Sequence, residues 1–176
     1  PIIVGGRIKC IDDIRQLLQV GADRVSINTS AFNEPNFLKN ALDKFGKQSI
    51  VVSVDYKKIN DDPIVFINSG SKNTEENLFK YIEKLQNIGV GEILINSIDH
   101  DGLMNGYDQN IFKNLDKKFD LKLICSGGLK SYEDIKNLYH STKIRAFSMS
   151  SVFHYTQLTP LILKKQLHDN SIPVRL

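Results

Sequence analysis

The stretch VGGRIKCIDDIRQLL (residues 4–18) occurs a second time, with one residue fewer, as SGGLKSYEDIKNLY (126–139). The segments that follow also match, because RVSINTSAF (24–32) corresponds to RAFSMSSVF (145–153), 121 residues further along the chain. Each copy has the same order: paired glycines after an apolar run, a helix-like stretch, and a second apolar run that ends in small hydroxyl residues. The chain therefore contains an internal repeat.

The paired glycines have two interpretations. They are tight turns in a duplicated packing unit, or places where backbone N–H groups approach an anion, since glycine has no Cβ to block the approach. Turn chemistry alone does not require hydroxyl residues at the end of the next strand, so the sequence favours two phosphate clamps. The predicted phosphate ligands are Gly6, Asn28 and Thr29 in the first clamp, and Ser126, Gly127, Gly128, Met149 and Ser150 in the second.

Strand-like and helix-like segments alternate along the whole chain, with apolar residues at helical spacing in the helix-like ones. Asn73-Thr74-Glu75-Glu76 is typical of a capped helix start. The alternation predicts an α/β fold with a parallel sheet covered by helices. The expected strands are 2–4, 24–27, 50–55, 92–97, 121–126 and 144–149, and the expected helices are 11–20, 34–45, 74–88, 108–118, 131–139 and 157–168.

A repeat of four βα units separated by 121 residues implies eight units in all, which close into a (βα)8 TIM barrel with two-fold internal symmetry. The chain has only six such units. We therefore expect it to cover units three to eight, as a single barrel domain (1–176) that lacks its N-terminal quarter.

Composition excludes several classes of protein. The net charge is +3, with basic and acidic residues interleaved, so neither nucleic acid nor a membrane surface is an expected partner. Two cysteines fit no disulfide framework and indicate a cytoplasmic protein. Four scattered histidines make a metal site improbable, and no cofactor is expected.

Six segments carry a family resemblance: residues 4–32, VVSVDYKK (51–58), GEILINSIDHDGLMNGYD (91–108), CSGG (125–128), SVFH (151–154) and IPVR (172–175). Together they resemble the cyclase subunit of imidazole glycerol phosphate synthase over essentially the whole chain. The resemblance implies a lyase of histidine biosynthesis, whose substrate carries a phosphate at each end. It also implies a glutaminase partner, docked at the N-terminal face of the barrel, that supplies ammonia. The products are imidazole glycerol phosphate and an aminoimidazole carboxamide ribotide.

Asp55 is expected to close an apolar strand and to project into the mouth of the barrel, although a strand-end Asp is often only a loop cap. The resemblance makes Asp55 one of two catalytic aspartates, acting as a general acid or base. The second aspartate and a loop lysine fall in the absent quarter. Asp101 and Gly102 are expected near the substrate, Gly70 is a weaker candidate of the same kind, and His100 is expected to be solvated.

Arg24 and Glu92 each open a strand, so we expect both at the N-terminal face of the barrel. A charge at a strand start is usually a surface ion-pair partner that contributes little. The resemblance instead places both residues in a charged ring that gates ammonia entry.

Three positions depart from the family pattern: Arg7 replaces a third glycine, Asn96 a threonine, and Met149 an alanine. Arg7 either adds charge to the phosphate site or obstructs it. The departures leave two alternatives open, namely an ammonia-dependent synthase subunit acting on a bacterial surface sugar, and a non-catalytic fragment that binds only phosphate or its partner.

Overall fold

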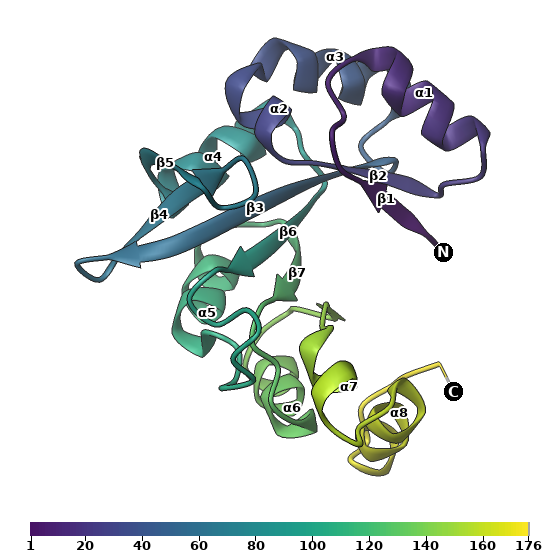
Figure 1. Cartoon of the computed structure of the whole chain (residues 1–176), viewed down its shortest axis with the longest axis vertical. Helices are drawn as coiled ribbons and strands as arrows, with labels where there is room; N and C mark the ends of the chain where they lie inside the picture. The colour runs from purple at the N-terminus through teal and green to yellow at the C-terminus, as the bar shows by residue number, and fades with distance from the viewer. Residues whose placement is uncertain (176) are drawn as a thin grey trace. The chain divides into compact units, whose positions relative to one another are not determined.

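The structure is a computed structural model that describes residues 1–175. It separates into two compact units, Pro1–Ile95 and a second that begins at Asn96, each of which is described by itself. In both units strands alternate with helices (Figure 1). This alternation confirms the predicted α/β class, a partial (βα)8 barrel.

The first unit is built on parallel strands joined by helices. Strand β1 pairs in parallel with β2, and β2 pairs in parallel with β3. The elements of this unit, in chain order, are β1 (Ile3–Gly5), α1 (Ile11–Gln19), β2 (Arg24–Ile27), α2 (Thr29–Asn33), α3 (Pro35–Phe45), β3 (Ile50–Ile59), β4 (Asp62–Ile67), β5 (Lys72–Asn77), α4 (Leu78–Ile88) and the start of β6 (Glu92–Ser97).

The second unit continues the alternation. Strands β7 and β8 are parallel, with Ile124 opposite Ala146. Cys125 of β7 is fully buried, and burial raises the pKa of its thiol well above the usual value. The elements of this unit are α5 (Gln109–Lys118), β7 (Lys122–Ser126), α6 (Tyr132–Ser141), β8 (Ala146–Phe147), α7 (Ser151–Tyr155) and α8 (Pro160–Asp169).

The sequence repeat is also a repeat of hydrogen bonds at the starts of α1 and α6. Asp13 Oδ2 accepts from the backbone N–H groups of Lys9 and Cys10, at 2.8 and 3.0 Å. Asp134 Oδ2 accepts from the equivalent pair in the second copy, at 2.9 and 3.0 Å. These carboxylates satisfy backbone donors that have no partner within the helix. The two copies therefore fold alike at the residue level.

Buried side chains repeat in the same register. Ile8 and Leu129 follow the paired glycines and are 5% and 3% exposed. Ile14 and Ile135, on the first turns of α1 and α6, are also buried. An apolar residue at each of these positions anchors the turn and the helix to the core of its own unit.

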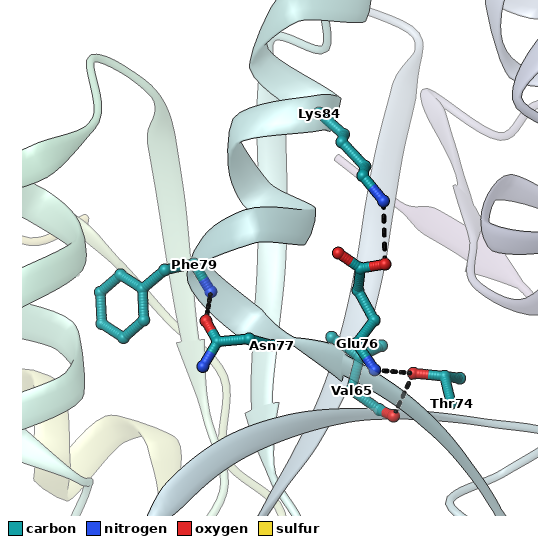
Figure 2. Close-up of polar contacts among 6 residues, drawn as sticks. All are labelled: Val65, Thr74, Glu76, Asn77, Phe79 and Lys84. Atoms are coloured by element: carbon teal, nitrogen blue, oxygen red, sulfur yellow. Dashed lines mark hydrogen bonds and ion pairs between the residues drawn. The ribbon is translucent and has the colours of Figure 1, made fainter.

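The expected helix over 74–88 is wrong at its start. Residues Lys72–Asn77 form β5, which pairs antiparallel with β4, and α4 begins only at Leu78. Figure 2 shows the reason. Thr74 Oγ1 donates to Val65 O at 2.7 Å and accepts from Glu76 N at 3.2 Å, so the polar segment is fastened to β4.

Asn77, rather than Asn73, caps helix α4. Asn77 Oδ1 accepts from Phe79 N at 2.9 Å, and Lys84 reaches back from the helix to pair with Glu76 at 2.8 Å (Figure 2). Asn73 Oδ1 instead accepts from Glu75 N at 2.7 Å in a local turn. The motif predicted as a helix start is therefore part of strand β5, whose pairing with β4 is irregular and in which Glu75 has a positive φ of 60°.

Other boundaries also differ from expectation. Two short helices, α2 and α7, follow β2 and β8 at matching places in the repeat, where none was expected. The last helix begins at Pro160. Thr159 caps it, because its Oγ1 accepts from Ile162 N at 3.2 Å. Among residues 1–175, no helix is both long and apolar enough to cross a membrane.

The Asp13 cap gives a pH-dependent contribution to stability. The backbone N–H of Lys9, followed by the N–H and thiol of Cys10, lowers the pKa of Asp13 from its usual 3.8. The ionised form is therefore favoured in the folded state, and its stabilisation is present above about pH 4 and lost as pH falls through the lower folded pKa. We expect Asp13→Asn to lower the free energy of unfolding at pH 6.5, and the difference from the parent to shrink as the pH falls below about 4.

Chemical denaturation across this pH range measures the effect. Asp43→Asn is the matched control, because Asp43 is an exposed residue of α3 and its variant should track the parent throughout. A difference for Asp13→Asn that stays constant with pH would show that the ionised carboxylate is not what stabilises the turn.

Candidate functional site

The first unit contains a cavity of about 440 Å³ at the carboxyl ends of β1 and β2. It is bounded by the loop after β1, the segment after β2, two side chains of β3, and the turn between β4 and β5. The lining residues are Gly5, Gly6, Arg7, Ile8, Lys9, Ser26, Ile27, Asn28, Thr29, Ser30, Ser53, Asp55, Asn68 and Ser69.

Strand register explains why these segments meet. Gly5 lies opposite Ser26, and Ser26 lies opposite Val51, so β1 and β2 end at one edge, beside β3. Beyond that edge β3 continues, and its side chains alternate between two faces. Ser53 and Asp55 face the cavity, whereas the residues between and beside them are buried in the core.

Asp55 lies within β3 and not at its end, so the expectation that it closes the strand is wrong. It lies at the change of pairing: the parallel ladder to β2 is in register up to Val52, and the antiparallel ladder to β4 begins with Asp55 opposite Phe66. The side chain still reaches the carboxyl edge of the parallel strands. Asp55 therefore lies at the predicted edge of the sheet, although it lies within a strand and not at the end of one.

Asn28 orients the Asp55 carboxylate. Asn28 Nδ2 donates to Asp55 Oδ2 at 2.8 Å. This hydrogen bond fixes the direction of the carboxylate in the cavity. Two residues predicted for different roles, one for phosphate and one for chemistry, are thus in direct contact.

Thr29 connects the segment after β2 to the turn between β4 and β5. Its Oγ1 accepts from Asn68 N at 3.0 Å, and the neighbouring Ser30 hydroxyl donates to Ile8 O. Asn68, Ser69 and Gly70 form three consecutive residues with positive φ, at 54°, 57° and 76°. Gly70 lies next to the lining residues without being one of them, so its visible role is in the turn.

The residues of the first predicted clamp lie together, since Gly6, Asn28 and Thr29 all line this cavity. Gly6 has φ 110°, and a Cβ added there would meet no atom within 4 Å. Arg7, the next residue, also has a positive φ of 58°. The loop thus exposes its backbone to the cavity through an unusual left-handed turn.

The glycines of the second clamp are held by close packing inside the second unit. A Cβ added at Gly127 would lie 2.7 Å from Ser97 O, and one at Gly128 would lie 2.7 Å from Gly106 O. Gly106 N also donates to Gly128 O at 2.7 Å. Glycine is required at these positions by backbone approach alone, whatever ligand the turn binds.

His100 belongs to the same packing and is not simply solvated, contrary to expectation. Its Nδ1 donates to Gly106 O at 2.7 Å, which closes the turn after β6. Asp101 and Gly102, in the same turn, are exposed, and Asp101 N donates to Ser97 O at 2.9 Å. The turn presents both candidate residues to solvent.

The remaining second-clamp candidates occupy strand and helix ends. Ser126 is the last residue of β7, and Ser150 is the exposed N-cap of the short helix α7. Met149 precedes Ser150 and is half-buried. Next to Met149, Ser148 is fixed on both backbone sides: its N donates to Cys125 O at 2.7 Å, and its O accepts from the Tyr107 hydroxyl at 2.9 Å.

Arg24 and Glu92 begin β2 and β6, as expected, at the ends of the strands opposite to the cavity-lining ends. Their side chains form an ion pair. Glu92 is only 15% exposed and Arg24 is 40% exposed, so the pair is partly shielded from water.

Some residues of the cavity were not predicted from the sequence. Ser53 could have been found, because it shares a strand face with Asp55 two residues later. Asn68 and Ser69 could not, because their place depends on the unexpected hairpin. In the second unit, the buried Ser97 hydroxyl has no hydrogen-bond partner among the described residues and carried no sequence signal.

Repeated βα units, with a polar cavity at the carboxyl ends of parallel strands, define the class of βα-barrel proteins. The family model described as "Histidine biosynthesis protein" matches residues 1–159. The chain belongs to this histidine biosynthesis family.

Individual relatives agree with this family assignment. The chain is 42% identical to the imidazole glycerol phosphate synthase subunit HisF of Natranaerobius thermophilus, over all of this chain and 70% of the relative. It is 37% identical to the protein of the same name from Hydrogenobaculum, with the same coverage. It is also 37% identical to that of Methanocaldococcus jannaschii, over all of this chain and 72% of the relative.

The two Gly-Gly turns should tolerate alanine differently. Gly6→Ala adds only the strain of a left-handed alanine, about 1 to 2 kcal/mol. Gly128→Ala adds the same kind of strain plus overlap with Gly106 O and His100 Cβ, both at 2.7 Å. We expect a loss of about 2 to 5 kcal/mol for Gly128→Ala. Urea unfolding followed by circular dichroism compares the two variants, and equal losses would contradict the packing described here.

Proposed function

We propose that this chain acts as the cyclase subunit of imidazole glycerol phosphate synthase. In this proposal it uses ammonia from a glutaminase partner to convert a bisphosphorylated aminoimidazole carboxamide ribonucleotide into imidazole glycerol phosphate and aminoimidazole carboxamide ribotide. The single observation that carries it is the cavity of the first unit, where an oriented carboxylate lies beside a predicted phosphate clamp. Relatives with the synthase name support the choice of reaction.

Asp55 is the proposed general acid or base. A carboxylate can accept and return a proton during ring closure if it is held in one orientation near the reacting atoms. The Asn28 hydrogen bond at 2.8 Å holds one oxygen, Oδ2. In the proposed mechanism the carboxylate held in this orientation exchanges the proton with the substrate.

The repeat supports a substrate with a phosphate at each end. The same device, paired glycines before a carboxylate-capped helix, occurs once in each unit. Gly6, Asn28 and Thr29 are the proposed ligands of one phosphate, and Ser126, Gly127, Gly128, Met149 and Ser150 those of the other. Asp101 and Gly102 are proposed to contact the substrate, with Gly70 as an additional candidate.

Asp55→Asn tests the chemical role. The change keeps the shape of the side chain but removes the proton-exchanging group, so ammonia-dependent turnover of the assembled synthase should fall at least 1,000-fold, about 4 kcal/mol in the barrier. The melting temperature should change little, which separates this result from unfolding.

Asp62→Asn is the matched control, because Asp62 is an exposed aspartate at the start of the neighbouring strand β4 and does not line the cavity. Its variant should keep full turnover. If Asp55→Asn retained activity within a few-fold of the parent, Asp55 would be only a structural residue.

The ion pair between Arg24 and Glu92 is the proposed gate for ammonia. Both residues begin their strands, at the ends opposite to the cavity, and the proposal places the glutaminase subunit at that face. The alternative is a surface ion pair, which would contribute little to stability and nothing to coupling. The limited exposure of Glu92, 15%, favours the first role.

Glu92→Gln distinguishes the two roles. The change breaks the charge pairing without altering side-chain size, so glutamine-dependent turnover should fall several-fold while turnover with added ammonium salt stays at the parent level. Asp12→Asn breaks a comparable ion pair, that with Arg15 on α1, and should affect neither activity. Equal loss of both activities in Glu92→Gln would refute a gating role.

A further inference from the structure

Arg7 is the residue by which the two copies of the repeat differ in length. Gly5 and Gly6 correspond to Gly127 and Gly128, and the buried Ile8 corresponds to the buried Leu129. One position therefore remains without a counterpart, between the second glycine and the buried apolar residue of the first copy. Arg7 occupies it.

The backbone of Arg7 is in a conformation that an arginine does not prefer. Its φ is 58°, in the left-handed region where any residue with a Cβ is disfavoured relative to glycine. The neighbouring Gly6 also has positive φ, so the loop has the geometry of a glycine turn. A strained residue at a candidate site calls for a reason beyond folding.

The charge of Arg7 is available to a ligand. Arg7 lines the cavity, and across residues 1–175 its guanidinium makes neither a hydrogen bond nor an ion pair. Lys9 and Asp55 are the other charged residues of the lining. The cavity therefore carries two cations and one carboxylate, and the carboxylate is already engaged by Asn28.

The rest of the lining suits a tetrahedral anion. Groups that can donate line the cavity on three segments: the Gly6–Lys9 loop, Thr29 after β2, and the turn at Ser69. A phosphate monoester has three terminal oxygens to match such donors, and a guanidinium binds two of them at once.

We propose that Arg7 is a specificity-determining residue, whose guanidinium recognises a terminal phosphate monoester of the substrate and discriminates it from a phosphate diester. A monoester is close to a dianion at neutral pH, whereas a diester carries one charge and fewer free oxygens. The biological substrate in this inference rests on the proposed function. The recognition itself is a property of the cavity and is measured without turnover.

Calorimetric titration at pH 8 with methyl phosphate, and with dimethyl phosphate as the diester, tests the inference. We expect the parent to bind methyl phosphate more tightly, and Arg7→Ala to weaken that binding about ten-fold. Arg7→Lys keeps the charge but not the paired donors, so its loss should be several-fold. Arg15→Ala removes one positive charge from the same unit outside the cavity and should stay within two-fold of the parent.

Arg7→Gly separates recognition from folding. It should raise the melting temperature by relieving the left-handed strain and still lose methyl phosphate binding as Arg7→Ala does. A merely structural residue would change the melting temperature alone.

Three results would overturn the inference. The first is tighter binding of methyl phosphate by Arg7→Gly, which would show that Arg7 obstructs the site. The others are unchanged binding by Arg7→Ala and equal binding of methyl phosphate and dimethyl phosphate by the parent. Failure of the proposed function would give a different result from failure of this inference. If the assembled synthase lacked cyclase turnover while methyl phosphate binding still depended on Arg7, the reaction would be wrong and the recognition right.

Discussion

Parallel pairing of β1, β2 and β3 is the constraint on which the candidate site depends. Gly5, Ser26 and Val51 lie side by side, so the segments that follow β1 and β2 must emerge at one edge, next to the continuing β3. The cavity, the hydrogen bond between Asn28 and Asp55, and the exposed loop at Arg7 are consequences of that register. A slip of one residue in β3 would turn Asp55 into the core and leave the cavity without its carboxylate.

The repeat and the alternation of strands and helices were predictable because they depend on local pattern. Apolar spacing located the cores of α1, α3 and α6. The β4–β5 hairpin was missed because KNTEEN (72–77) is polar and has no alternation. It forms a strand through bonds to β4 such as that from Thr74 to Val65, and distant partners of this kind override local propensity.

The candidate site was predictable to the level of residue type and strand edge. The sequence indicated Gly6, Asn28, Thr29 and Asp55, and these residues do line one cavity. It did not indicate that Asn28 would donate to Asp55, because a side-chain contact depends on rotamers and on register across two strands. In the second unit the glycines were interpreted as ligands, but close approach of Ser97 and Gly106 is a sufficient reason for both. That approach involves residues far apart in sequence, which no local pattern reveals.

The burial of Cys125 gives the protein a built-in chemical probe of local opening. Alkylating reagents react with the thiolate, and in β7 the thiol is both inaccessible and held protonated by its raised pKa. Cys10, at the start of α1, is exposed and lies in the other unit. Its thiol is accessible to the reagent in the folded protein, whereas Cys125 reacts only after β7 separates from its surroundings. The interval between the two labelling events, followed by mass spectrometry, therefore reports how often the second unit opens under native conditions.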